Sequence, residues 1–121
     1  MLDEKILDEE YLYRGIIDIN WDFENDRPSS ATFKDSKGVS VDREGDRTED
    51  KCIEALTSKR NFLAICKVKA KQIREVNAIV KYVPLQDNIY HSEIHDSDER
   101  IQLRGKKPKK IRDKASVVFK R

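Results

Sequence analysis

Residues 62–68 read Phe62-Leu63-Ala64-Ile65-Cys66-Lys67-Val68 and contain the longest apolar run of the chain, Phe62 to Cys66. A strand that is apolar on both of its faces lies inside a sheet that is covered on both sides. We therefore predict a central strand here. The run is far shorter than the roughly 20 apolar residues that a membrane-spanning helix needs, so we expect no membrane partner.

Three further segments are predicted strands, and two of them show the alternation that is typical of strands. Tyr11 to Trp21 places apolar residues at every second position, and Gly15 within it predicts a bulge or a bend. Ala78 to Val83 is followed by a proline, which cannot donate to a strand ladder. Ile89 to His95 alternates in the same way. These segments predict partners for the central strand.

A separate hairpin is predicted in the part of the sequence that lies between the first strand and the central strand. Its arms are Ala31 to Lys34 and Val39 to Val41, around the turn Asp35 to Gly38. The glycine supplies the positive φ angle that such turns need.

Four segments have the apolar spacing of helices: Leu2 to Glu10, Glu49 to Arg60, Lys69 to Val76 and Ile111 to Phe119. Thr48 is a suitable N-cap for the second of them. Because strands and helices interleave without regular βαβ alternation, we predict a single α+β domain over residues 1–121. Its sheet is antiparallel-rich, and its helices pack on one face.

The charge of the chain is unevenly distributed. Its 121 residues carry a net charge of only +2 although 40% of them are charged. Residues 1–26 hold nine acids against two bases, whereas residues 100–121 hold ten bases against one acid. Such polarity indicates either two ends that pack together or a basic surface for a polyanion.

The basic end begins with an irregular loop at residues 104–110, before the predicted amphipathic helix 111–119. Seven of the cations of this end lie within the eleven residues 104–114: Arg104, Lys106, Lys107, Lys109, Lys110, Arg112 and Lys114. Such a cluster releases counterions when it meets phosphates, and binding is then salt-sensitive. The alternative is a solvated loop, or one that docks on the acidic N-terminal segment.

The two cysteines, Cys52 and Cys66, form no Cys-x-x-Cys pair and have no further cysteines for a zinc site. Both lie in apolar segments, where a buried thiol behaves as a small hydrophobic group. Together with the absence of a secretory pattern at residues 1–4, this predicts a cytoplasmic protein. A disulfide between them is the alternative.

His91, Glu93 and His95 project from one face of the predicted strand 89–95, because side chains alternate along a strand. Two imidazoles and a carboxylate are candidate metal ligands, or a base with a polarising partner. An exposed polar strand face is the alternative. We predict that His91 contacts the ligand.

The polar loop that contains Arg27, Ser29 and Ser30 has the composition of loops that grip a phosphate. Plain connections have this composition too. The chain contains neither a P-loop nor a Rossmann fingerprint, and we predict no bound cofactor.

Tyr13-Arg14-Gly15 on the first strand resembles the arginine motif of the ADP-ribosyltransferases. In that family the arginine helps to hold NAD, a serine-centred strand motif follows, and a glutamate completes the set. Residues 29–32, read Ser-Ser-Ala-Thr, and Glu93 match the later members in order. The resemblance covers these three short fragments and implies an NAD- or nucleotide-directed transferase that uses Arg14, His91 and Glu93.

The leading functional prediction is a binding module for an anionic ligand, either a nucleic acid or a nucleotide. The predicted contacts are Arg14, Arg27, Ser29, Ser30, His91, Lys106, Lys107, Lys109 and Lys110. The small transferase is one alternative. A protein–protein interaction partner, such as a toxin neutraliser or an assembly subunit, is another, and the sequence leaves the oligomeric state open.

Overall fold

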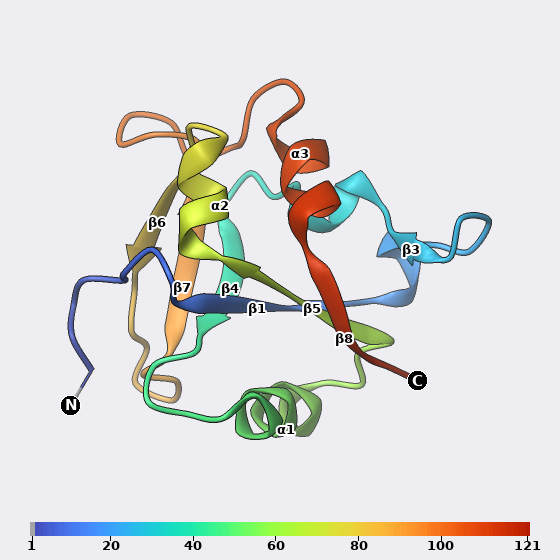
Figure 1. The fold of residues 1–121 in the computed structure, drawn as a ribbon, viewed down its shortest axis with the longest axis horizontal. Coiled ribbons are helices and arrows are strands. Elements are labelled where there is room, and N and C mark those ends of the chain that lie inside the picture. The colour runs from blue at the N-terminus through green and yellow to red at the C-terminus, as the bar shows by residue number, and fades with distance from the viewer. Residues whose placement is uncertain (1) are drawn as a thin grey trace.

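The strand predicted at residues 62–68 forms inside a six-stranded antiparallel sheet in the computed structural model, which describes residues 2–121 (Figure 1). The strand order is β6-β7-β4-β1-β5-β8. The strands are β1 (Tyr11–Ile16), β4 (Val39–Arg43), β5 (Ala64–Lys69), β6 (Ile79–Tyr82), β7 (His91–His95) and β8 (Ser116–Lys120). A separate pair consists of β2 (Trp21–Asp22) and β3 (Arg27–Pro28). The predicted α+β class with an antiparallel-rich sheet is confirmed.

The three helices lie on both faces of the sheet, not on one face as predicted. They are α1 (Glu49–Lys59), α2 (Ala70–Glu75) and α3 (Lys107–Lys114). Leu12 of β1 packs with Ile73 of α2 and Ile111 of α3, whereas Tyr13 packs with Leu56 of α1. Figure 1 shows α1 on one side of β1 and β5, with α2 and α3 on the other. A strand that is apolar on both faces needs cover on both.

Helix α1 begins where it was predicted. The Thr48 hydroxyl accepts a hydrogen bond from the Lys51 backbone N–H at 3.3 Å, as an N-cap does. On the buried side of α1, Cys52 lies in the cluster with Tyr13, while Cys66 of β5 lies in the cluster on the opposite face. Both are free thiols, and burial raises the pKa of Cys52 to about 11 and of Cys66 to about 12.

The predicted helix at 111–119 is wrong. Helix α3 begins at Lys107, within the stretch that was predicted to be an irregular loop, and ends at Lys114, and β8 follows. Pro108 fits the first turn of a helix, where its missing N–H costs nothing. Val117, Val118 and Phe119 have side chains that favour strands. Val117 and Phe119 pair with Cys66 and Ile65 on the edge of β5, and the register shifts between these two pairs.

The predicted helix at Leu2 to Glu10 is also wrong, because the segment is extended with one turn. Ile6 is buried in the core, and the carbonyls of Asp8 and Glu10 accept hydrogen bonds from the backbone N–H groups of Lys71 and Ala70. Those two groups begin α2 and have no acceptor within the helix. The acidic segment therefore caps α2 instead of forming a helix of its own.

The first predicted hairpin arm is a 3₁₀ turn, η2 (Ser30–Phe33), because Thr32 and Phe33 are buried against the core. The following turn is as predicted: the Gly38 N–H donates to the Asp35 carbonyl at 3.2 Å, with Gly38 at φ +102°. The first strand stops at Ile16, short of the predicted Trp21, and a 3₁₀ turn, η1 (Asp18–Asn20), follows.

Candidate functional site

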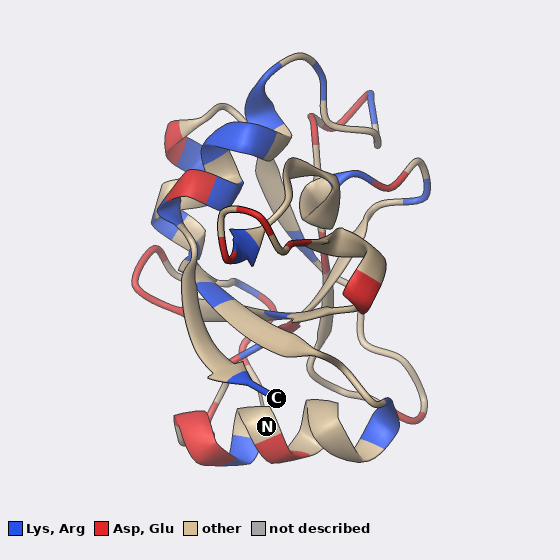
Figure 2. Cartoon of the chain, turned by 90° about the vertical axis from the view of Figure 1, so that its right-hand side faces the viewer, with Lys and Arg blue, Asp and Glu red and all other residues tan. Residues whose placement is uncertain are grey.

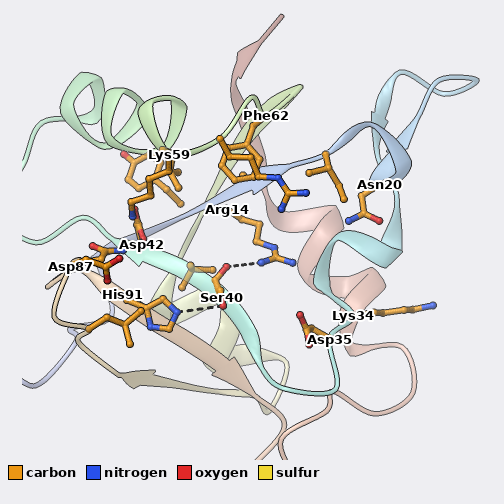
Figure 3. Close-up of a pocket in the computed structure, with 18 residues that line it drawn as sticks. Arg14, Asn20, Lys34, Asp35, Ser40, Asp42, Lys59, Phe62, Asp87 and His91 are labelled. Atoms are coloured by element: carbon orange, nitrogen blue, oxygen red, sulfur yellow. Dashed lines mark hydrogen bonds and ion pairs between the residues drawn. The ribbon is translucent and has the colours of Figure 1, made fainter.

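A cavity opens where β1 and β4 separate. These strands pair at only two positions, Leu12 with Arg43 and Tyr13 with Asp42, whereas β1 and β5 pair at six. The later half of β1 therefore has no strand beside it on the β4 side, and a cleft of about 670 Å³ lies there (Figure 3). This volume lies within the range of about 300–1,000 Å³ that small-molecule sites occupy.

Arg14 spans this split in the sheet. Its Nη1 donates to the Ser40 carbonyl of β4 at 2.7 Å, and its Nε donates to the Thr32 carbonyl of η2 at 3.1 Å (Figure 3). Burial lowers the pKa of the guanidinium, while the nearby Asp35 acts in the opposite direction. An arginine stays protonated at neutral pH. Because both bonds go to neutral carbonyls, its positive charge is not cancelled by an ion pair among the described residues.

The other charged groups of the cleft are mixed in sign. Besides Arg14, the lining contains Lys34, Lys59 and Arg60, together with Asp35, Asp42 and Asp87. Asp42 is buried and already engaged: its carboxylate oxygens lie 3.4 Å from Lys59 Nζ and 2.9 Å from Asn88 Nδ2. With Lys59 and Asp42 paired, the cleft lining holds Arg14, Lys34 and Arg60 against Asp35 and Asp87, a small excess of positive charge.

One wall of the cleft is apolar and flat. The Phe62 ring lies against the backbone of Gly15 so closely that a Cβ atom at Gly15 would stand 2.5 Å from it. Gly15 stays in register opposite Ile65, so the bulge predicted there does not occur. The glycine is needed for the close approach of the ring, and Phe62, Leu56 and Ile17 form an apolar wall.

His91 lines the same cleft as Arg14, so the structure brings these two predicted residues together. His91 Nδ1 lies 2.9 Å from the Val83 carbonyl, and Nε2 lies 3.4 Å from Ser40 Oγ. Since a carbonyl only accepts, Nδ1 is the protonated nitrogen of the neutral ring. Nε2 then presents its lone pair to the hydroxyl of Ser40.

Glu93 and His95 do not line the cleft. They pair with each other at 2.8 Å, next to Gly38. No group of three His, Cys, Asp or Glu side chains within residues 2–121 is placed to hold a metal ion. Of the fragments that resemble the ADP-ribosyltransferases, Arg14 therefore lies in the cleft and Glu93 lies outside it.

The predicted loop contacts lie outside the cleft, against α3. The carbonyl of Pro28 accepts a hydrogen bond from Arg112 at 3.1 Å. The hydrogen bond from Arg112 lowers the pKa of Asp113, and the charge of Arg27 makes a smaller contribution in the same direction. The Ser29 hydroxyl is buried and has no hydrogen-bond partner among the described residues, while Ser30 begins η2.

Three of the seven cations of the basic stretch serve the fold. Arg104 and Lys107 bind the buried carboxylate of Asp96 at 3.1 and 2.9 Å. Arg112 is buried and pairs with Asp113 at 2.7 Å. The remaining four are exposed on or beside α3: Lys106, Lys109, Lys110 and Lys114. Figure 2 marks the lysines and arginines of the chain in blue, and several lie along helices.

Comparisons with known proteins identify no relative: no family model, no curated protein and no solved structure matches the chain. Within residues 2–121, no helix has the length and apolar character required to cross a membrane. The case for a function therefore depends on the geometry of the cleft and on the exposed lysines of α3.

The Asp96 cluster generates a stability prediction. Its bonds to Lys107, to the Arg104 backbone N–H and to the Arg104 side chain lower the pKa of Asp96 to about 2. An acid whose pKa is lowered by folding stabilises the protein above its unfolded pKa, about 3.9, and that contribution disappears as the pH falls toward 2. Asp96→Asn should lower the free energy of unfolding by about 2 kcal/mol at pH 7.

Urea denaturation at pH 7, 4 and 2.5 measures this difference. It should shrink between pH 4 and 2.5, because the wild-type carboxyl is then partly protonated. The matched control is Asp98→Asn in the same loop, whose exposed side chain should leave stability unchanged at every pH. Equal losses for the two variants would contradict the assignment.

Proposed function

We propose that this chain is a small cytoplasmic binding module for an anionic ligand, and that a nucleotide binds in the cleft at Arg14. The observation that carries the proposal is the guanidinium of Arg14, which lies in the split of the sheet without an ion-pair partner among the described residues. Nε and one N–H of Nη1 already donate to carbonyls. The remaining N–H groups, on Nη1 and Nη2, are donors that suit phosphate oxygens.

The remainder of the cleft fits the other parts of a nucleotide. The apolar wall formed by Phe62, Leu56 and Ile17 suits the face of a base. Asp87 and Asn88 offer polar groups for sugar hydroxyls, and Lys34 adds a second cation for phosphate. A nucleotide therefore meets a complementary group at each of its three parts.

Arg14→Lys tests the proposal, because lysine keeps the positive charge but lacks the paired N–H donors of the guanidinium. The loss of a charge-assisted contact is worth about 1.5–3 kcal/mol, so nucleotide affinity should fall roughly ten- to hundred-fold. Fluorescence anisotropy with a labelled ADP, in competition with unlabelled AMP, ADP and NAD, measures the affinity. Thermal melting of each variant shows whether the domain is still folded.

Lys34→Ala is the second variant, because it lies in the cleft without bonding β1 or β4 to another strand. It should weaken binding as well. Lys37→Ala in the same loop is the matched control, since its side chain is exposed and does not line the cleft. The proposal would be wrong if the wild-type protein bound none of the nucleotides at low salt. It would also be wrong if the variants were folded and their affinity were unchanged.

A second candidate is nucleic acid binding through α3. Lys106, Lys110 and Lys114 recur at four-residue intervals, which places them along one side of the helix, and Lys109 lies beside them. Pro28 and η2 pack against the same helix. The observation that favours this candidate is the exposure of all four lysines.

Replacing Lys106, Lys109, Lys110 and Lys114 by Gln should weaken binding to a single-stranded RNA and flatten its salt dependence. At about 0.7 per phosphate contact, the slope of log K against log salt should become smaller by up to roughly 3. Lys107 is left in place because it binds Asp96. Anisotropy at several salt concentrations measures the slope, with Lys37→Gln/Lys51→Gln as the control for loss of exposed charge. An unchanged slope would rule out this surface.

A further inference from the structure

Ser40 and His91 meet on one face of the sheet at the edge of the cleft. Strands β4 and β7 are antiparallel, with His91 directly opposite Asp42. Ser40 is two residues from Asp42 and therefore points to the same face, as a diagonal neighbour of His91. Ser40 Oγ and His91 Nε2 lie 3.4 Å apart, as Figure 3 shows.

The ring of His91 is oriented to act as a base. Its Nδ1–H donates to the Val83 carbonyl at 2.9 Å, which fixes both the tautomer and the position of the ring. The lone pair on Nε2 faces the Ser40 hydroxyl. A hydroxyl, a base within reach and a third group that orients the base form the usual arrangement of an activated nucleophile, and the first distance is often longer without ligand.

Arg14 places a positive charge next to this pair. Its Nη1 is bonded to the carbonyl of Ser40 itself, at 2.7 Å. Arg14 and Ser40 line the same cleft, so an anionic group held by the guanidinium shares that cleft with the Ser40 hydroxyl. A fixed cation at this point also stabilises the negative charge that develops on oxygen during a displacement.

We infer that Ser40 is a nucleophile, activated by His91, that cleaves a phosphoester bound through Arg14. This inference rests on the proposed function, since it takes its substrate class from the phosphate site. It adds chemistry to that site, because a binding module has no need of a base beside a hydroxyl.

The reaction balances without a further reactant except water. The Ser40 oxygen forms a bond to phosphorus, and the bond from phosphorus to the leaving oxygen breaks, with its electron pair staying on that oxygen. The hydroxyl proton passes to His91 Nε2 and from there to the leaving group. Water, deprotonated by His91, then attacks the phosphoserine, and the bond from phosphorus to the Ser40 oxygen breaks. The proton on His91 passes to that oxygen, which restores the Ser40 hydroxyl and the neutral imidazole as inorganic phosphate is released.

A neutral fluorophosphonate probe tests the nucleophile separately from the phosphate site. Wild-type protein should become labelled on Ser40, which peptide mass spectrometry identifies. Ser40→Ala should abolish the label, and His91→Gln should slow labelling by at least roughly a hundred-fold, as the loss of a general base does. Ser36→Ala, which removes an exposed hydroxyl outside the cleft, should label like the wild type.

Hydrolysis of p-nitrophenyl phosphate is the second readout. It should fall to background in Ser40→Ala and in His91→Gln, and Arg14→Lys should impair it more strongly than it impairs reaction with the neutral probe. Nucleotide binding without labelling of Ser40 would overturn the inference and leave the proposed function standing. Labelling of Ser40 without nucleotide binding would support the nucleophile and overturn the proposed ligand. Labelling that survives His91→Gln would overturn the role of the base.

Discussion

The structure depends on how the sheet is held together where β1 and β4 part. Backbone carbonyls at such a split lose their ladder partners, and buried polar groups without partners are costly. Arg14 solves this by donating to the carbonyls of Ser40 and Thr32, which joins β1 to β4 and to η2. The same side chain that closes the sheet is thus the one whose charge lines the cleft.

Much of the heavy charge of the chain serves to join distant segments. The acidic N-terminal residues meet cations of the sheet and of α2: Asp8 pairs with Arg74, Glu9 with Lys69, and Glu10 with Arg43. None of the ion pairs found in residues 2–121 links this segment to α3. Of the two explanations for the uneven charge, docking of one end on the other therefore receives no support. The exposed lysines of α3 remain directed at solvent.

The elements that could be predicted are those whose local signals agree with their surroundings. Strand β5 and helix α1 have a clear pattern and a clear cap, and both form as expected. The segment from Ile111 to Phe119 has apolar residues at helical offsets. Its β-branched residues lie beside the edge of β5, however, and residues 116–120 therefore form a strand that pairs with β5. At the N-terminus, residues 2–10 are extended, and the carbonyls of Asp8 and Glu10 accept hydrogen bonds from the first backbone N–H groups of α2, which have no acceptor within the helix.

The candidate site could be predicted only in part. Arg14 and His91 were recognisable as single residues, yet the cleft exists because β1 and β4 pair over two positions, and no local pattern encodes that register. Ser40 occupies an outward position between Val39 and Val41, where any polar residue is expected. Phe62 was assigned to the central strand and instead precedes it, since Gly15 leaves room for its ring.

The bonds of Arg14 have a consequence for the kinetics of recognition. Moving the guanidinium would break contacts with two other segments, so the floor of the cleft keeps its form before a ligand arrives. A rigid receptor loses little conformational freedom on association. For the proposed nucleotide, encounter with this cleft would then be governed by diffusion and by the local field, not by a slow rearrangement of the protein.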